Sequence, residues 1–226
     1  MATILIVGAD RGIARAMVEQ LAERGDRVIA ACLGEGADLA ATGVRVEPAV
    51  DVTSDSAVDA MASRLRSDEV TLDWLVNVAG VLGVDELGRI DLADVRRQFE
   101  INAMGPLRVV QATMDRLRAG SKVGVVTSRV GALSDNSSGG MYAYRMSKAA
   151  ANMATLNLHH DLVPKGVAVL ALHPGLTATD LTKDFPRDLP WITPEAAAEG
   201  LIRCMDDLTL ESSGQFRHSS GELLPW

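Results

Sequence analysis

Tyr144 and Lys148 lie four residues apart in the run Tyr-Arg-Met-Ser-Lys. Residues at this spacing share one face of a helix, so the Lys148 ammonium is expected beside the Tyr144 phenol. A free tyrosine has a pKa of about 10 and is a poor base near neutral pH. A positive charge about 4 Å away would lower that pKa by as much as ~3 units. The pair could then move protons at neutral pH, although Tyr-x-x-x-Lys alone is also typical of a half-exposed helix face.

Tyr142 is the other tyrosine of the chain. It lies six residues before Lys148, about 600° around a helix and therefore on a largely different face. We expect it to line a substrate pocket. His159, His160 and His173 have no ligand spacing to a carboxylate or a cysteine, and we predict no metal site.

The composition describes a chain that can bury a sizeable core. Of its 226 residues, 47% are hydrophobic and 23% are charged. We expect residues 1–226 to form one domain, which suits this length. No stretch approaches ~18 uncharged apolar residues, so no membrane span is predicted. A formal net charge of −8, without a run of Lys and Arg, argues against a nucleic-acid partner.

Cysteine usage and the N-terminal run both favour a cytoplasmic protein. Cys32 and Cys204 form neither a metal-spaced cluster nor a disulfide framework. The apolar run that includes Thr3–Val7 has no basic region before it and ends in a glycine loop. It is therefore interpreted as a strand and not as a signal peptide.

Short apolar runs alternate with longer helical patterns along the chain. Strands are predicted near Thr3–Val7, Arg27–Cys32, Val44–Val50, Leu72–Asn77, Lys122–Thr127, Val167–Leu172 and Gln215–Arg217. Helices are predicted near Gly12–Arg24, Ser54–Arg66, Leu92–Arg118, Met141–Leu162 and Pro194–Asp207. The inner strands are continuous apolar runs, and the alternation implies a doubly wound α/β fold with a parallel sheet covered on both faces. Gly105-Pro106 should bend the third helix, because proline lacks a backbone donor.

A glycine-rich turn follows the first predicted strand. Gly8, Gly12 and Ala14 give the spacing Gly-x-x-x-Gly-x-Ala in front of a helical pattern. Glycines let the backbone approach a pyrophosphate, and the helix N-terminus favours its negative charge. Such turns occur in many α/β proteins. The place of this one, after the first strand of a βαβ unit, favours a nucleotide site.

Seven motifs in order resemble those of the short-chain dehydrogenase/reductase family over essentially the whole chain. They are Gly8-x-x-x-Gly12-x-Ala14, Asp51-Val52, Asn77-Val78-Ala79-Gly80 (with Val in place of one Ala), Asn102, Ser128-x-x-Gly131, Tyr144-x-x-x-Lys148 and Pro174-Gly175-x-x-x-Thr179. Within the family, the run Gly139–Tyr144 and the C-terminal run ending at Trp226 resemble the C-factor/sniffer-like carbonyl reductases.

The resemblance implies a single-domain Rossmann-type fold and an NAD(P)-dependent oxidoreductase that transfers a hydride between nicotinamide and a carbonyl or alcohol. Tyr144 would be the general acid in reduction and the base in oxidation. Lys148 would lower its pKa and bind the nicotinamide ribose. Ser128 would donate a hydrogen bond to the oxyanion, and Asn102 would hold a water that links Lys148 to solvent. Ser128 could instead merely end a strand, and Asn102 could support the Gly105-Pro106 kink.

The same resemblance assigns the cofactor contacts. They are expected from Gly8, Asp10, Arg11, Gly12, Ile13, Leu33, Asp51, Val52, Asn77, Ala79, Gly80, Tyr144, Lys148, Pro174, Gly175, Thr177 and Thr179.

The end of the second strand bears on the choice of dinucleotide. An acidic residue there favours NAD, and an arginine favours the 2′-phosphate of NADP. This chain has Cys32-Leu33-Gly34 at that point, and Arg11 occupies a place where a basic residue often supports NADP in this family. Glu35 nearby could oppose it. We predict NADP as the preferred cofactor, with NAD possible.

Two other functions fit the same fold. One is a catalytically weak dinucleotide-binding regulatory or signalling protein, against which the intact set Asn102, Ser128, Tyr144 and Lys148 argues. The other is an enzyme acting on nucleotide-linked sugars, but such chains are usually longer. The family resemblance also implies a homodimer or homotetramer formed through the helices Leu92–Arg118 and Met141–Leu162.

Overall fold

The strands of the protein form one parallel sheet. The computed structural model describes residues 1–186 and 188–226. Neighbouring strands are parallel and follow the order β3-β2-β1-β4-β5-β6-β7. The strands are β1 Thr3–Val7, β2 Arg27–Ala31, β3 Arg45–Glu47, β4 Leu72–Asn77, β5 Leu117–Val126, β6 Ala168–His173 and β7 Gln215–His218. The order reverses between β1 and β4, as expected for a doubly wound sheet.

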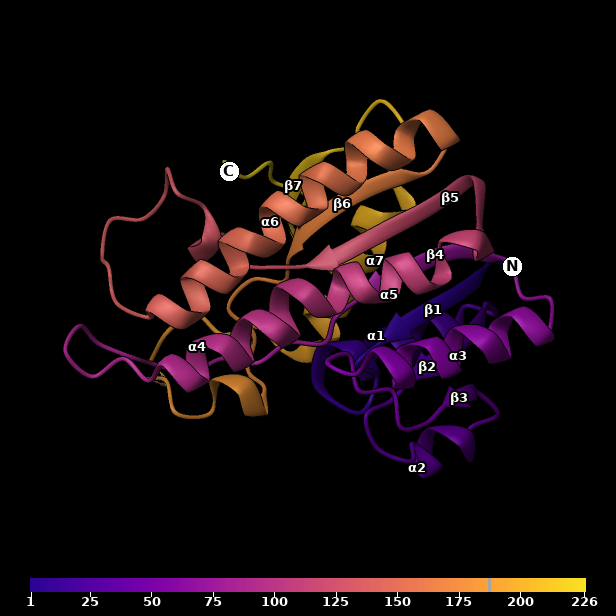
Figure 1. Ribbon diagram of the computed structural model, residues 1–226, viewed down its shortest axis with the longest axis horizontal. Helices are drawn as coiled ribbons and strands as arrows, with labels where there is room; N and C mark the ends of the chain where they lie inside the picture. Colours follow the sequence, from indigo (N-terminus) through magenta and orange to yellow (C-terminus); the bar gives the residue numbers. More distant parts are fainter. Residues whose placement is uncertain (187) are drawn as a thin grey trace.

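Helices cover both faces of this sheet (Figure 1). Strand β1 shows why, because its apolar side chains alternate between two cores. Ile4 and Ile6 pack with α1 and α7, whereas Leu5 and Val7 lie in the core beneath α3, α5 and α6. The helices are α1 Gly12–Glu23, α2 Ala37–Ala40, α3 Asp55–Ser67, α4 Leu92–Phe99, α5 Gly105–Thr113, α6 Tyr142–Leu162 and α7 Pro194–Asp206.

The predicted helix Leu92–Arg118 is divided in the structure, and its predicted end is wrong. A π-helical turn, Glu100–Met104, separates α4 from α5 immediately before Pro106. A short 3₁₀ turn ends at Arg116, and β5 begins at Leu117, which pairs with Leu72. The predicted start of this strand at Lys122 is therefore too late. The register shifts between Leu72 and Trp74, so the first part of β5 lacks a regular strand pattern.

The region after β2 also departs from the prediction. Strand β3 is only three residues long instead of the predicted Val44–Val50. Pro48 has no N–H to donate to the ladder, and Ala49 has a φ of 54°. The short helix α2, which the sequence did not indicate, precedes β3.

The carboxyl ends of the parallel strands meet along one edge of the sheet. Strands β1, β4, β5 and β6 end there at Val7, Asn77, Val126 and His173. A cavity of about 610 Å³ opens at this edge. Among the residues that the structure describes, none of the helices has the length and apolar character needed to cross a membrane.

Candidate active site

Helix α6 places Tyr144 and Lys148 together, as their spacing predicts. Both side chains are buried, with 8% and 4% of their surface exposed. The Lys148 Nζ atom lies 5.7 Å from the centroid of the Tyr144 ring. It donates a hydrogen bond to the carbonyl of Val126 at the end of β5, at 3.1 Å. The two groups are therefore held against the carboxyl edge of the sheet and are not on a half-exposed helix face.

Ser128 follows β5, and its hydroxyl acts on the Tyr144 phenol. Burial raises the pKa of Tyr144 to about 12, and the Ser128 hydroxyl partly opposes that rise. Burial also lowers the pKa of Lys148 to about 8. The expectation that Lys148 lowers the pKa of Tyr144 is corrected, because the pKa of Tyr144 is raised and not lowered. Removal from water favours the neutral phenol, and Lys148 is not among the causes of the Tyr144 shift.

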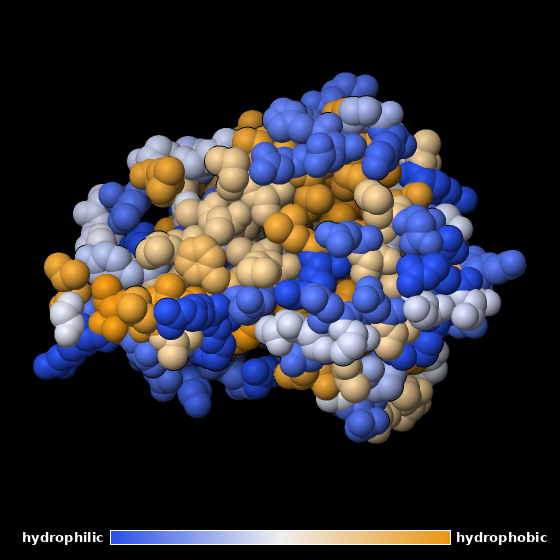
Figure 2. Space-filling model, in the orientation of Figure 1, coloured by the Kyte–Doolittle hydropathy of each residue, from blue (hydrophilic) through white to orange (hydrophobic). Residues whose placement is uncertain are grey.

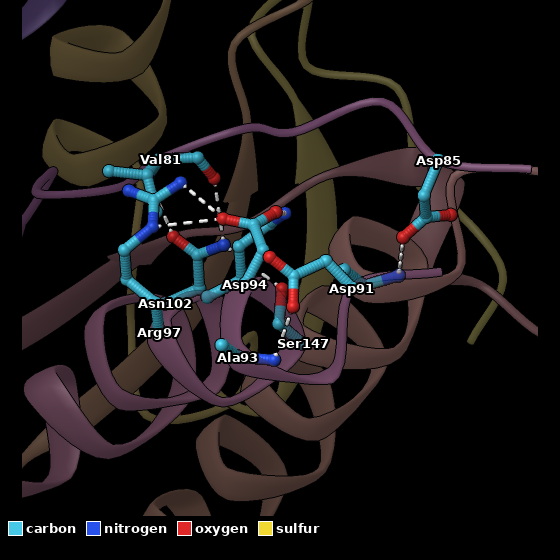
Figure 3. Close-up of polar contacts among 10 residues, drawn as sticks. Val81, Asp85, Asp91, Ala93, Asp94, Arg97, Asn102 and Ser147 are labelled. Atoms are coloured by element: carbon cyan, nitrogen blue, oxygen red, sulfur yellow. Dashed lines mark hydrogen bonds and ion pairs between the residues drawn. The ribbon is translucent and has the colours of Figure 1, made fainter. Parts of the chain in front are cut away.

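Asn102 lies in the π-helical turn, and its amide is fully engaged (Figure 3). Its Oδ1 accepts from the Val81 N–H at 2.8 Å, while its Nδ2 donates to the Val81 carbonyl and to Ser147 Oγ, both at 2.9 Å. A Cβ atom on Gly80 would lie 3.2 Å from Asn102 Oδ1 and 3.4 Å from Lys148 Nζ. Gly80 thus lies between Asn102 and Lys148, and π turns of this kind are frequent at functional sites.

The glycine turn after β1 forms a cradle that a larger residue would fill. A Cβ on Gly8, whose φ is 86°, would lie 2.7 Å from the main chain of Ala79. No side chain caps α1, and its first turn carries no acidic residue. The first N–H groups of a helix have no intrahelical partner and attract an anion. These features fit the pyrophosphate of a dinucleotide.

The cavity at this edge brings together most of the predicted cofactor residues. Its lining includes Gly8, Asp10, Arg11, Gly12, Ile13, Leu33, Asp51, Val52, Ala79, Gly80 and Thr179. Residues that were not predicted as cofactor contacts also line it, namely Ala14, Val50, Val78, Val81, Ile101, Ala178, Asp180, Leu181, Lys183 and Pro194. Several of these are direct neighbours of predicted contacts, so widening each motif by one residue would have found them. Leu181, Lys183 and Pro194 had no such signal, and Ile101 adjoins Asn102, which was predicted as a catalytic residue and not as a cofactor contact.

The other predicted cofactor residues lie outside the lining of this cavity. Asn77 is buried at the end of β4, and neither atom of its amide has a hydrogen-bond partner in the described structure. Gly175 has a φ of 84° and adjoins His218. The Thr177 hydroxyl faces the carbonyls of Pro174 and Gly175 at 3.4 Å. Tyr144 and Lys148 also lie outside the lining, and the cofactor contacts of all these residues remain predictions.

Acidic groups surround the end of β2. The Asp10 carboxylate accepts the backbone N–H groups of Leu33 and Gly34, each at 2.8 Å. Burial, together with the carboxylates of Asp10 and Asp38, raises the pKa of the Cys32 thiol to about 11. Across the cavity, the Arg11 guanidinium lies 3.7 Å from the Asp180 carboxylate, with both side chains largely exposed. Arg11 therefore forms an ion pair with Asp180, a partner that the sequence did not indicate.

His173, at the end of β6, adds a neutral ring to the site. Burial lowers its pKa to about 3, and the positive charges of His218, Arg129 and Lys148 act in the same direction. Its ring packs edge-on against that of His218, with centroids 5.1 Å apart. Within the described residues, no group of three or more His, Cys, Asp or Glu side chains could hold a metal ion.

The comparisons with known proteins identify the family. A model described as short chain dehydrogenase matches residues 2–190. The chain belongs to the short-chain dehydrogenase family. The fold is thus the expected Rossmann-type one, and the protein is an NAD(P)-dependent oxidoreductase acting on CH–OH or C=O groups. The regulatory alternative is not favoured.

Two relatives place this short-chain dehydrogenase more closely. The 1-hydroxy-2-glutathionyl-2-methyl-3-butene dehydrogenase of Rhodococcus sp. (strain AD45) is 59% identical over 226 residues, which is 100% of both chains. The C-signal protein of Myxococcus xanthus is 45% identical over 158 residues, which cover 69% of this chain and 93% of that protein. The second match agrees with the predicted resemblance to C-factor-like proteins.

A solved structure matches this short-chain dehydrogenase over its full length. It is a short-chain dehydrogenase/reductase of Burkholderia multivorans with bound NADP. The TM-score is 0.87 at 25% identity, and the match covers 100% of this chain and 99% of the other.

Proposed function

We propose that Tyr144 is the general acid and base of this dehydrogenase, with Ser128, Lys148 and Asn102 beside it. The observation that supports this is the buried phenol at the carboxyl edge of the sheet, whose pKa the Ser128 hydroxyl acts to lower. In reduction, the phenol gives its proton to the carbonyl oxygen, and the Ser128 hydroxyl donates a hydrogen bond to the same oxygen. A phenol with a pKa of about 12 is protonated at neutral pH and ready for this step.

Alcohol oxidation runs the same proton transfer in reverse. The Tyr144 oxygen then takes the proton of the substrate hydroxyl, which requires the phenolate. Burial opposes the phenolate, and the Ser128 hydroxyl favours it. Asn102 fixes Val81 and lies next to Gly80 and Lys148, where the proposed relay water would connect Lys148 to solvent.

The cofactor is proposed to be NADP, with NAD also accepted. When bound, it supplies or accepts the hydride. The glycine turn, the uncapped N-terminus of α1 and Arg11 would hold its phosphates. The Burkholderia multivorans structure, which contains NADP, supports this choice. Asp10, in the turn after β1, places a carboxylate beside the end of β2, and such a carboxylate can bind a free ribose hydroxyl.

The substrate is proposed to be a glutathione conjugate that carries a hydroxyl next to the thioether carbon. This rests on the 59% identity, over both complete chains, to the dehydrogenase of 1-hydroxy-2-glutathionyl-2-methyl-3-butene. The reaction would oxidise the CH–OH carbon to a carbonyl, with the hydride passing to the cofactor and the proton to Tyr144.

A matched pair of substrates tests this proposal. The protein is mixed with NADP⁺ or NAD⁺ and the glutathionyl alcohol, and the increase in reduced nicotinamide is followed by absorbance. The same alcohol without the glutathionyl group is the control. We expect kcat/KM for the conjugate to exceed that of the control at least about tenfold, and Tyr144→Phe to lower kcat about 10²-fold or more. Equal rates on both alcohols would contradict the substrate class, and an active Tyr144→Phe variant would contradict the mechanism.

The protein is further proposed to be a cytoplasmic homodimer or homotetramer. The exposed face over α5 and α6 carries apolar side chains (Figure 2), including Leu107, Met146 and Met153. Burying this face against a second copy would remove it from water. The two free cysteines, both buried, suit a reducing compartment.

A further inference from the structure

Helix α6 begins without a capping side chain of its own. Its N-cap residue, Met141, is in the left-handed region with a φ of 49° and makes no side-chain capping bond. The first turn carries no acidic residue. The first N–H groups of a helix need partners from outside it, and a negative charge near them stabilises the helix. Because Tyr144 lies in this first turn, the groups that satisfy these N–H groups also fix the phenol.

Asp85 supplies those partners from a distant part of the chain (Figure 3). Its two carboxylate oxygens accept the N–H groups of Tyr142 and Ala143, the latter at 2.9 Å. Its backbone carbonyl accepts the N–H of Met141 at 3.0 Å. A residue 57 positions before Tyr142 therefore caps the helix that carries Tyr144.

The segment that carries Asp85 is also held by hydrogen bonds at its N-terminal end, at Val81. Val81 exchanges two hydrogen bonds with Asn102 in the π-helical turn. Gly83 lies between Val81 and Asp85. A Cβ atom there would collide with the Asp94 carboxylate and lie 2.6 Å from Gln98 Nε2, so this segment packs closely against α4. We call Val81–Asp85 the strap. It connects the turn that holds Asn102 to the first turn of α6.

We propose that Asp85 is a positioning residue for Tyr144. It holds the first turn of α6 against the strap, so that the Tyr144 phenol stays beside the Ser128 hydroxyl. Its negative charge at the helix N-terminus also favours the protonated phenol. The inference rests on the proposed role of Tyr144 as the acid and base of the reaction.

The charge of Asp85 acts among several other groups around Tyr144. Ser128, after β5, contributes a hydroxyl that favours the phenolate, and Lys148 is a basic group on α6 itself. His173 contributes a neutral ring from the end of β6, in the field of Lys148, Arg129 and His218. The negative charge on the strap opposes the positive end of the α6 dipole. Removing it should lower the pKa of the phenol.

The test compares Asp85→Asn and Asp85→Ala with Asp91→Asn. Asp91 follows the strap and caps α4, accepting the Ala93 N–H at 2.8 Å, so it is the same residue type in the same kind of position. All variants should lose some thermal stability. Asp85→Ala should lower kcat about tenfold with little change in the Kd of the dinucleotide. Asp85→Asn keeps an acceptor oxygen and should restore part of that kcat. It should also shift the pKa in the kcat profile for alcohol oxidation downward by about half a unit.

Two results would overturn the proposal. One is that the pKa in the pH profile of kcat shifts no further in Asp85→Asn than in Asp91→Asn. The other is a wild-type kcat in Asp85→Ala. Tyr144→Phe is measured in parallel to separate this inference from the proposed function. If Tyr144→Phe stays active, the function fails. If Tyr144→Phe is inactive and the Asp85 variants behave like Asp91→Asn, only the role of Asp85 fails.

Discussion

The Tyr144 phenol and the Lys148 ammonium are both buried, and burial moves their pKa values in opposite directions. The phenol rises to about 12, whereas the ammonium falls to about 8. Each shift favours the neutral form, because a charge is poorly solvated in the interior. At neutral pH the phenol is therefore a proton donor, and Lys148 lies close to its titration range. A change in nearby charge, such as the loss of Asp85 proposed above, should therefore change the pH dependence of kcat.

Asp10 gives a prediction about the choice of dinucleotide. Its carboxylate lies at the end of β2, held by the N–H groups of Leu33 and Gly34. A negative charge there repels a 2′-phosphate and can bind a free 2′-hydroxyl. Asp10→Asn should raise the affinity for NADPH relative to NADH by about fivefold, equivalent to ~1 kcal/mol of removed repulsion. Fluorescence titration of both dinucleotides measures the ratio.

Asp51→Asn is the matched control for this prediction. Asp51 also lines the cavity, but its Oδ1 atom accepts the backbone N–H of Thr53 in the loop between β3 and α3. Asp51→Asn should weaken the binding of NADH and of NADPH by similar factors. An unchanged NADPH-to-NADH ratio in Asp10→Asn would show that Asp10 does not take part in the choice.

At the scale of the element, α6 is held by neighbours from three parts of the chain. The strap caps its first turn through Asp85. Val126 at the end of β5 accepts from Lys148, and Thr127 donates to the Lys148 carbonyl at 3.2 Å and to the Asn152 amide oxygen at 2.7 Å. The 3₁₀ turn that includes Gly131 lies directly against the helix. The side chains of the site thus depend on a helix whose place is fixed along its first three turns.

Gly131→Ala should disturb this packing strongly. A Cβ there would lie 2.6 Å from the carbonyl carbon of Lys148 and 2.8 Å from the N of Ala149. Main-chain atoms of a helix cannot move aside as a flexible side chain can. We expect a loss of about 2–3 kcal/mol in the free energy of unfolding, together with lower kcat because Lys148 is displaced. Chemical denaturation and steady-state kinetics measure the two effects.

Gly139→Ala provides the comparison. Gly139 has a φ of 67°, but nothing lies within 4 Å of an added Cβ. Only the strain of the left-handed backbone remains, which costs about 1 kcal/mol. If Gly139→Ala lowered stability and kcat as much as Gly131→Ala, close packing against α6 would not explain the effect.

At the scale of the whole molecule, the sheet order brings distant loops to one edge. The turn after β1, the strap after β4, Ser128 after β5 and Thr179 after β6 all follow carboxyl ends of parallel strands. The cofactor cavity and the Tyr144 site are therefore neighbours, although their residues span most of the sequence. Helices α5 and α6 form an outer face of the molecule, on which Leu107 of α5 and Met146 and Met153 of α6 are exposed.

We predict that one substitution on this outer face weakens the association between copies of the chain. Met153 lies on α6 with 59% of its surface exposed. Met153→Asp would place a charge in the proposed contact between copies, which costs free energy when it is buried without a partner. We expect size-exclusion chromatography with light scattering to show an oligomer for the wild-type protein and a smaller species for the variant. Lys165→Asp, near the far end of α6, is the control and should leave the mass unchanged. A monomeric wild-type protein would contradict the proposed assembly.

Local sequence patterns were sufficient for most of the sheet and for placing Tyr144 and Lys148 on one helix. The apolar runs of β1, β4 and β6 lie where predicted, because buried parallel strands need continuous apolar residues. The spacing of Tyr144 and Lys148 likewise determined that both lie on one helix face. The start of β5 and the end of α5 were missed, because Leu117–Ser121 are held by contacts with the distant Leu72 and not by a local pattern.

The sequence by itself determined which groups could carry protons and which turn could hold a pyrophosphate. Only the tertiary structure decided their charge states and supports. The pKa values of Tyr144 and Lys148 follow from burial, and burial depends on elements that are far apart in the chain. The pairing of Arg11 with Asp180 and the capping of α6 by Asp85 join residues that no local spacing relates. Electrostatic free energies depend on distance and solvent exposure in three dimensions, and a one-dimensional pattern contains neither.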